Sequence, residues 1–272
     1  METKIHDQSP KALSDLKQQL FSLRFDDPDT RKHLLEGPYY DVLLYDGLFR
    51  KYGCKPRGAL YLGAHKGEML WTLVLLGFKH VLLVEPQPDL FERLQKNVAL
   101  VEQLLQCYDD FVDGEPKASI QAVQCAVSDS NSEATFYVTS ESMLSSLSKP
   151  LTESLAQPSY SVQDATVTRE ITVPTQTLDH LVAQSSGSPS DFNFLYMNIQ
   201  GAELQALEGA SETLPHLDCI YLENNLVSRY ESCPEPEEID TFLKTSHFHK
   251  AWGLRDLEYG TSYDLYVKMP PQ

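Results

Sequence analysis

From residue 58 onward the chain alternates short apolar runs with longer amphipathic stretches. Short apolar runs bounded by polar or glycine positions are typical of buried strands, and apolar positions at helical spacing are typical of helices. The runs predict strands at 59–63, 81–85, 120–127, 192–199 and 219–223, and the longer stretches predict helices at 69–78, 90–105, 202–214 and 235–245. Strands that alternate with helices indicate a parallel sheet with helices on both faces. We therefore expect an α/β, doubly wound fold.

The C-terminal end breaks this alternation. Two strand-like runs, 250–254 and 263–267, follow each other across a short turn around Gly260. Strands joined by a short turn pair antiparallel. We expect an antiparallel hairpin at the edge of a mostly parallel sheet.

The first 52 residues have a helical pattern of their own. Leucines recur at helical spacing from Leu13 to Leu23, and a further apolar stretch follows Pro38. We expect a helical extension over residues 1–52, packed on a main domain over residues 53–272. A lid or a dimer surface is the alternative role for this extension, and a homodimer is left open.

An insertion over about residues 134–175 separates the third and fourth strands. Alternation of apolar and polar positions at 134–139 and 171–175 predicts two extra strands that are able to pair with each other. The serine-rich segment 140–168 and the polar linker 183–191 predict long loops, which in compact domains are commonly functional lids or disordered. We expect the first loop, together with the N-terminal helices, to close over an acceptor.

The amino-acid composition limits the binding partners and the cellular compartment that we expect for this protein. The 22 Lys and Arg against 39 Asp and Glu give a net charge of −17, which disfavours broad binding to nucleic acid or to a membrane surface. The longest apolar stretch, 69–78, is too short to cross a bilayer, and the N-terminus lacks the apolar core of a signal peptide. Five scattered cysteines without a C-x-x-C pair argue against a disulfide framework and favour a reducing compartment; they are Cys54, Cys107, Cys125, Cys219 and Cys233. We expect a cytoplasmic protein.

The first predicted strand runs into YLGAHKGE, a turn with Gly63 and Gly67. Glycine there lets the backbone approach a ligand, and the N–H groups of the following helix attract a negative group. A merely tight strand–helix turn is the alternative. His65 and Glu68 break the dinucleotide fingerprint G-x-G-x-x-G, which makes a nicotinamide pyrophosphate site less favoured.

Glu85 ends the second predicted strand and is followed by Pro86. A carboxylate at that strand tip can accept hydrogen bonds from both hydroxyls of a ribose, because doubly wound sheets bind ligands at the carboxyl ends of their strands. An exposed strand-end glutamate is the alternative.

At this point the sequence resembles the FkbM-type S-adenosylmethionine-dependent methyltransferases. The resemblance is carried by successive motifs over about residues 58–268: YLGAHKGE, VEPQPDLFERL, QAVQCAVSD, ATFYVTSESMLSSLS, ITVPTQTLD, LYMNIQGAELQALEGA and DCIYLENN. It implies a class I methyltransferase (Rossmann-like) fold with a seven-stranded sheet and an antiparallel final hairpin. It also implies S-adenosyl-L-methionine as cofactor.

The resemblance also assigns residues to the cofactor and to the acceptor. The positions implied for the cofactor are Tyr61, Gly63, Ala64, His65, Gly67, Glu68, Glu85, Pro86, Ala126, Val127, Ser128, Asn198 and Gln200. The positions implied for the acceptor are Ser145, Ser146, Gln200, Glu203, Glu223 and Asn224. For Glu203, which opens a predicted helix, an electrostatic role at the helix N-terminus is the alternative.

The sequence departs from the family pattern at two positions. Tyr61 and Asn198 stand where the family usually has aspartate. An amide orients a substrate but does not accept its proton at neutral pH, so Asn198 removes a usual base and metal ligand. The motif His247-x-His249 has no further ligands nearby, and we expect no metal.

Methyl transfer requires alignment of the acceptor with the sulfonium and, for an alcohol, a base. His65 is the first candidate base because imidazole suits proton transfer near neutral pH; pinning the turn by hydrogen bonds is its alternative role. Glu223, at the end of the fifth predicted strand, is the second candidate, and a binding or structural acid is its alternative role. Asn198 completes the predicted catalytic set, beside the transferred methyl.

The resemblance therefore implies a methyltransferase, and it favours one that acts on oxygen of a small-molecule or sugar-containing metabolite. N-methylation, a catalytically inactive homologue that binds cofactor or acts as a scaffold, and a nucleotide-dependent oxidoreductase are the alternatives. Ser142, Ser145 and Ser146 have no evident His–Asp partners in the sequence, so a serine hydrolase is disfavoured.

Overall fold

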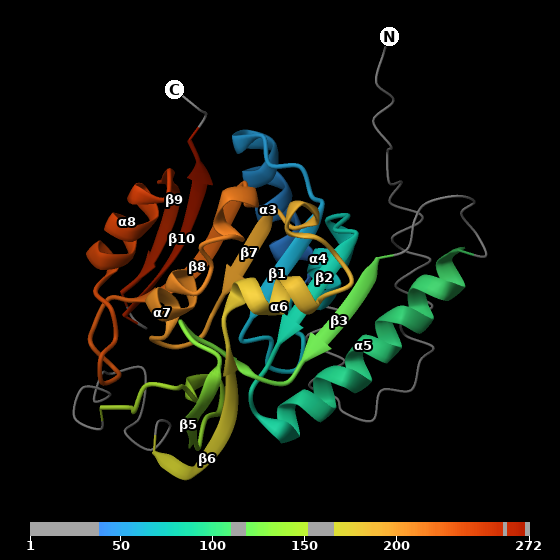
Figure 1. Ribbon diagram of the computed structural model, residues 1–272. Coiled ribbons are helices and arrows are strands. Elements are labelled where there is room, and N and C mark those ends of the chain that lie inside the picture. The colour runs from blue at the N-terminus through green and yellow to red at the C-terminus, as the bar shows by residue number, and fades with distance from the viewer. Residues whose placement is uncertain (1–37, 110–117, 152–165, 258–259, 270–272) are drawn as a thin grey trace.

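A computed structural model describes residues 38–109, 118–151, 166–257 and 260–269 of the protein (Figure 1). The leucine-patterned part of the N-terminal extension lies outside the described residues, as does 152–165 of the serine-rich segment. Among the described residues, no helix is both long enough and apolar enough to cross a bilayer.

Seven strands form the central sheet in the order β3-β2-β1-β7-β8-β10-β9. The five parallel strands are β1 (Gly58–Leu62), β2 (His80–Val84), β3 (Ser119–Val123), β7 (Phe194–Met197) and β8 (Cys219–Asn225). The antiparallel hairpin at the edge is β9 (Phe248–Asp256) and β10 (Thr261–Lys268), with β10 paired to β8. The expected doubly wound fold and its final hairpin are confirmed. Strand order reverses between β1 and β7, so the ligand crevice of such a sheet falls at the carboxyl ends of these two strands.

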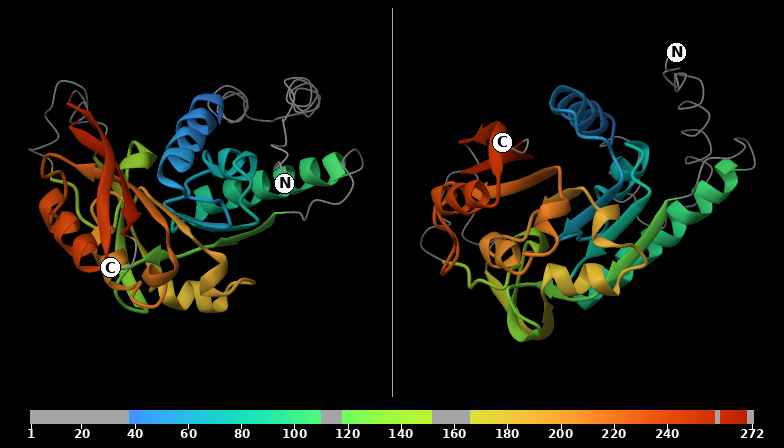
Figure 2. Two further views of the ribbon diagram at one scale, coloured as in Figure 1. Left: turned by 90° about the horizontal axis from the view of Figure 1, so that it is seen from above. Right: turned by 45° about the horizontal axis from the view of Figure 1, so that its top comes forward.

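Helices cover both faces of the sheet (Figure 2). One face carries α3 (Pro38–Tyr52), α4 (Leu70–Leu75) and α5 (Pro88–Asp109), and the other carries α6 (Leu178–Gln184), α7 (Glu203–Glu208) and α8 (Pro236–Thr245). Successive strand residues point to opposite faces, so Tyr61 packs in the first layer while Leu60 and Leu62 pack in the second. Burial on both sides explains why these strands read as almost continuous apolar runs.

The insertion forms a second, three-stranded sheet at the carboxyl end of the central strands (Figure 1). Its strands are β4 (Ala126–Val127), β5 (Ser132–Thr139) and β6 (Val167–Gln176). The antiparallel pairing of β5 with β6 confirms the pairing expected from their alternation. The prediction of one strand at 120–127 is wrong, because the chain leaves the central sheet after Val123 and residues 126–127 pair with β6 instead.

Several helices differ from the prediction. α4 is shorter than the predicted 69–78, and α5 is longer than the predicted 90–105. α6 was not predicted: Thr177 caps it by accepting a hydrogen bond on its Oγ1 from the His180 N–H at 3.1 Å, so a helix precedes the linker expected at 183–191. The helix predicted at 202–214 is shorter, since α7 ends at Glu208 and a separate 3₁₀ turn covers Leu214–His216.

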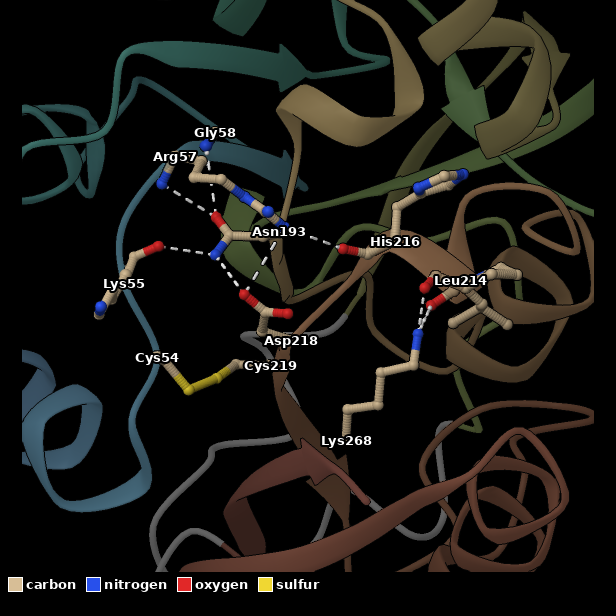
Figure 3. A network of polar contacts seen from close by, with 11 residues as sticks. Cys54, Lys55, Arg57, Gly58, Asn193, Leu214, His216, Asp218, Cys219 and Lys268 are labelled. Carbon is tan, nitrogen blue, oxygen red and sulfur yellow. Dashed lines mark hydrogen bonds and ion pairs between the residues drawn. A yellow bond between two sulfur atoms is a disulfide. The ribbon is translucent and has the colours of Figure 1, made fainter. Parts of the chain in front are cut away.

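Asn193 ties together the amino ends of β1, β7 and β8 (Figure 3). Its Oδ1 accepts hydrogen bonds from the N–H groups of Arg57 and Gly58, at 3.0 and 3.4 Å. Its Nδ2 donates to the carbonyl of Lys55 at 2.8 Å and to Asp218 Oδ2 at 2.7 Å. One buried amide therefore supplies four hydrogen bonds to the segments that enter the three central strands.

A disulfide between Cys54 and Cys219 lies in the same region (Figure 3). It joins the segment before β1 to the start of β8 across a sequence separation of 165 residues. The cysteine spacing argued against a disulfide framework, and it did not reveal this single disulfide, because strand order brings together two residues that are far apart in sequence. Cysteine usage therefore no longer favours a reducing compartment.

Asn193→Ala should lower the free energy of unfolding by about 2–4 kcal/mol, because two backbone N–H groups lose their acceptor and two acceptors lose their donor. Urea denaturation followed by circular dichroism measures this change. The matched control is Asn131→Ala, since exposed Asn131 accepts one hydrogen bond, from the Thr177 N–H at 2.9 Å, and its loss should have a much smaller effect. Equal effects of the two substitutions would contradict the role assigned to Asn193.

Candidate active site

The turn after β1 has a backbone that few residues adopt. Gly63, His65 and Gly67 have φ of 75°, 50° and 89°. A Cβ atom at position 63 would clash with the carbonyl oxygen of Asn198, so the turn after β1 touches the turn after β7. Glycine at position 63 is thus explained by the contact between two turns, and His65 is held in the left-handed region that non-glycine residues seldom occupy.

Glu85 holds this turn from the tip of β2. The side chain is 3% exposed, and its Oε2 accepts from the His65 N–H while its Oε1 accepts from the Gln87 N–H, both at 2.9 Å. Burial raises the pKa of Glu85 to about 7, although the two backbone hydrogen bonds act in the opposite direction. The alternative of an exposed strand-end glutamate is wrong. Each oxygen keeps acceptor capacity, because a carboxylate has about four lone-pair sites.

Glu203 holds the turn after β7 in the same manner. Gln200 and Gly201 have φ of 55° and 97°. Glu203 is 2% exposed, and its two carboxylate oxygens accept from the N–H groups of Ile199 and Gly201, at 3.2 and 2.9 Å. Burial raises the pKa of Glu203 to about 7. The structure thus places Glu203 beneath the turn, where it satisfies backbone donors.

A chain of side-chain hydrogen bonds leads from this turn to the tip of β8. The Tyr230 hydroxyl lies 3.0 Å from Gln200 Oε1, and Gln200 Nε2 donates to Asn198 Oδ1. Asn198 Nδ2 in turn donates to Glu223 Oε2 at 3.0 Å. Burial raises the pKa of Glu223 to about 7, while the Arg229 guanidinium and the two amides act to lower it. The chain fixes the orientation of both amides and ends on a carboxylate.

A small apolar cavity of about 20 Å³, roughly the space of one water molecule, lies beside the turn after β1. Four residues predicted for the cofactor line it: Gly63, Pro86, Ala126 and Val127. Its lining is apolar, and buried Glu85 follows directly on its lining residue Val84, where a ribose would lie. The residues therefore fit the nucleoside part of S-adenosylmethionine in their chemistry, and a bound adenine requires this cavity to widen. Sequence reasoning missed Phe136 and Leu147, which the insertion contributes to the lining.

Residues 140–151, called the strap below, cross the carboxyl ends of the strands. Ser146 Oγ donates to the carbonyl of Gln200 at 2.7 Å, and Ser145 Oγ accepts from the Thr139 N–H at 3.1 Å. The far end of the strap pairs with the loop after β8, where the Leu151 N–H donates to the carbonyl of Arg229 at 2.7 Å. The predicted acceptor residues Ser145 and Ser146 are both buried in this arrangement.

The strap also contacts the turn after β1. Ser142 Oγ lies 2.8 Å from His65 Nε2, and Glu68 Oε1 lies 2.6 Å from His65 Nδ1. The sequence showed no His–Asp partners for Ser142 in a nucleophile-elbow context, and it did not reveal that His65 and Glu68 lie beside this serine in the fold. Ser142 and His65 are 77 positions apart, and only the folding-back of the insertion brings them together.

Three predicted site residues lie apart from the main group. Asn224 points to the opposite face of β8 from Glu223 and donates to Asp264 Oδ2 at 2.7 Å. Tyr61 is buried beneath the turn, with its ring edge-on to Tyr196 at 4.9 Å between ring centroids. Ser128 donates its N–H to Gln176 and so extends the pairing of the small sheet.

Within the described part of the chain, no group of three or more His, Cys, Asp or Glu side chains could hold a metal ion. His249 lies on β9 and His247 immediately precedes that strand.

Comparison with solved structures gives the same fold. An FkbM methyltransferase from Methylobacillus flagellatus KT aligns with a TM-score of 0.50 and 16% identity, over 94% of this chain and 59% of that one. Magnesium protoporphyrin IX methyltransferase from Synechocystis PCC 6803, solved with bound S-adenosylhomocysteine, aligns at 0.44 and 11%, over 95% of each chain. A Pyrococcus horikoshii protein assigned as an RNA methyltransferase aligns at 0.40 and 14%, over 94% of this chain and 99% of that one. The last two scores are too low to bear on the acceptor.

Comparison of sequences assigns the family. A search of curated proteins found no match. The methyltransferase FkbM domain matches residues 62–255, which is more than half of the chain and includes both turns, Glu85 and Glu223. The chain belongs to the FkbM methyltransferase family and is an S-adenosylmethionine-dependent methyltransferase.

Proposed function

We propose that this methyltransferase transfers the methyl group to an oxygen of a small-molecule or sugar-containing acceptor, with Glu223 as the general base. The observation that supports the proposal is the hydrogen bond from Asn198 Nδ2 to Glu223 Oε2 at 3.0 Å. Glu223 is a partly buried carboxylate in contact with the residue that we expect beside the transferred methyl group. A hydroxyl acceptor requires such a base because its proton has to leave as the new C–O bond forms.

The cofactor would be held by the elements already described. Glu85 would accept hydrogen bonds from the ribose hydroxyls, and the apolar slot at Pro86, Ala126 and Val127 would take the adenine. The turn from Gly63 to Gly67 would carry the methionine part. When bound, S-adenosylmethionine supplies a methyl group on a positively charged sulfur.

Glu223 is the stronger candidate for the base. Asn198 is an amide without basic character, and its Nδ2 and Oδ1 are engaged by Glu223 and Gln200. His65, the first candidate in the sequence, has both ring nitrogens in hydrogen bonds, to Glu68 and Ser142. Glu223 has a pKa of about 7, so a large share is ionised and able to take a proton near neutral pH.

The strap and the net charge support a small acceptor. The strap is bonded to Gln200 at one point and to the loop after β8 at another, so it covers part of the ligand edge and restricts access. A net charge of −17 opposes a polyanionic acceptor. Glu223 is the proposed contact on the acceptor side. Ser145 and Ser146, which are buried with their hydroxyls bonded within the protein, are proposed to hold the strap in place.

Glu85→Ala should weaken binding of S-adenosylhomocysteine by about 1.5–3 kcal/mol, the scale of hydrogen bonds to a charged group. Isothermal titration calorimetry on the folded variant measures the change. Exposed Glu208 on α7 serves as the matched control, and Glu208→Ala should bind as the wild type does. An unchanged affinity in Glu85→Ala would remove Glu85 from the ribose site.

Glu223→Gln should lower the rate of methyl transfer by about 10²–10⁴-fold with little change in cofactor affinity, because the amide cannot accept the acceptor's proton. The wild-type rate should rise as pH increases through about 7, since the base acts in its ionised form. The assay uses trideuteromethyl-labelled S-adenosylmethionine with a fractionated metabolite extract, and mass spectrometry detects the labelled product. The control variant is Glu208→Gln. A product methylated on nitrogen, or a Glu223→Gln variant as active as this control, would contradict the proposal.

A further inference from the structure

His65 lies between a carboxylate and a hydroxyl. Its Nδ1 is 2.6 Å from Glu68 Oε1, and its Nε2 is 2.8 Å from Ser142 Oγ. The His65 side chain is 13% exposed, and its backbone N–H is fixed by Glu85 at 2.9 Å. The ring is therefore held at both nitrogens and at its own backbone.

The carboxylate sets the direction of these hydrogen bonds. Burial opposes ionisation of Glu68, but its interaction with His65 outweighs the burial and holds the Glu68 pKa below its ordinary value. An ionised carboxylate only accepts, so Nδ1 carries the proton that it donates to Glu68, and in the neutral form of the ring Nε2 is the acceptor. The Ser142 hydroxyl then donates to Nε2, which is the arrangement of nucleophile, base and orienting acid.

A further donor stands beside this serine. Gln87 Nε2 lies 3.4 Å from the Ser142 carbonyl oxygen, and the Gln87 side chain is buried. An amide has two N–H donors, so one remains to stabilise negative charge that develops next to Ser142. Methyl transfer as proposed above does not use Ser142, and it uses the turn that contains His65 only to carry the methionine part of the cofactor.

We propose that Ser142 is a nucleophilic serine, activated by His65 and Glu68, which accepts acyl or phosphonyl groups from activated esters. In the acyl case Oγ bonds to the carbonyl carbon, the bond to the leaving alcohol breaks, and the serine proton passes through His65 Nε2 to that alcohol. Water then hydrolyses the acyl-enzyme, releases the acid and restores Ser142. This activity is independent of the methyl-transfer function proposed above.

A fluorophosphonate probe tests the proposal without knowledge of the natural ester. Oγ attacks phosphorus, fluoride leaves and the serine proton goes to His65, so a stable adduct forms. We expect one equivalent of adduct on the wild-type protein, mapped to Ser142 by peptide mass spectrometry. Ser142→Ala should lose the adduct, and His65→Ala should slow labelling by about 10²–10⁴-fold. Hydrolysis of p-nitrophenyl acetate should fall in parallel.

The matched control is Ser148→Ala, which changes a neighbouring strap serine that has no histidine partner among the described contacts and should label as the wild type does. If His65→Ala fails to fold, Glu68→Gln and Ser142→Ala still decide the matter. Absence of labelling on folded wild type, or equal labelling rates in wild type and Glu68→Gln, would overturn the proposal. The contacts of Ser142 with His65 and of His65 with Glu68 would then serve only to hold the strap in place. Calorimetry with S-adenosylhomocysteine on Ser142→Ala should show unchanged affinity, which separates this result from failure of the cofactor site.

Discussion

The active site depends on two buried glutamates that satisfy the backbone donors of two strand-tip turns. Glu85 accepts from the His65 N–H in the turn after β1 and from the Gln87 N–H in its own segment after β2, and Glu203 accepts from two N–H groups of the turn after β7. Each turn contains one non-glycine residue in the left-handed region, His65 and Gln200. Such conformations are costly and persist only where the surroundings enforce them. The carboxylates of Glu85 and Glu203 hold the two turns in these conformations.

Because the turns are fixed, the side chains above them have defined positions. His65 faces the strap, while Gln200 joins Asn198 to Tyr230 in one chain of hydrogen bonds. The Tyr230 hydroxyl is also within 3.1 Å of the Leu144 carbonyl, so the strap and this chain meet at one buried group. The proposed acceptor side of the site is thus formed by the insertion and the loop after β8, and both contact the same two turns.

The sequence predicted the sheet, the hairpin, the β5–β6 pair and the adjacency of Gly63 and Glu85, because each depends on local periodicity or on strand order. It missed the break after Val123, since an apolar run does not show which sheet its last residues join. The Cys54–Cys219 disulfide and the Ser142–His65 contact were missed because separations of 165 and 77 residues leave no local pattern. Tyr230 carries no periodic signal at all. Helix α6 was predictable, since threonine followed by Leu178, Leu181 and Val182 is a capped amphipathic start.

The pairing of an amide with Glu223 has a consequence for how the site holds its charge. A carboxylate at position 198 would stand where the Asn198 amide nitrogen now lies, 3.0 Å from Glu223 Oε2. Two acids that close would bind a single proton between them, and neither would titrate on its own. With asparagine at position 198, Glu223 on β8 is the single acid of this pair. Its protonation then depends on the pH of the solution and not on a second carboxyl group after β7.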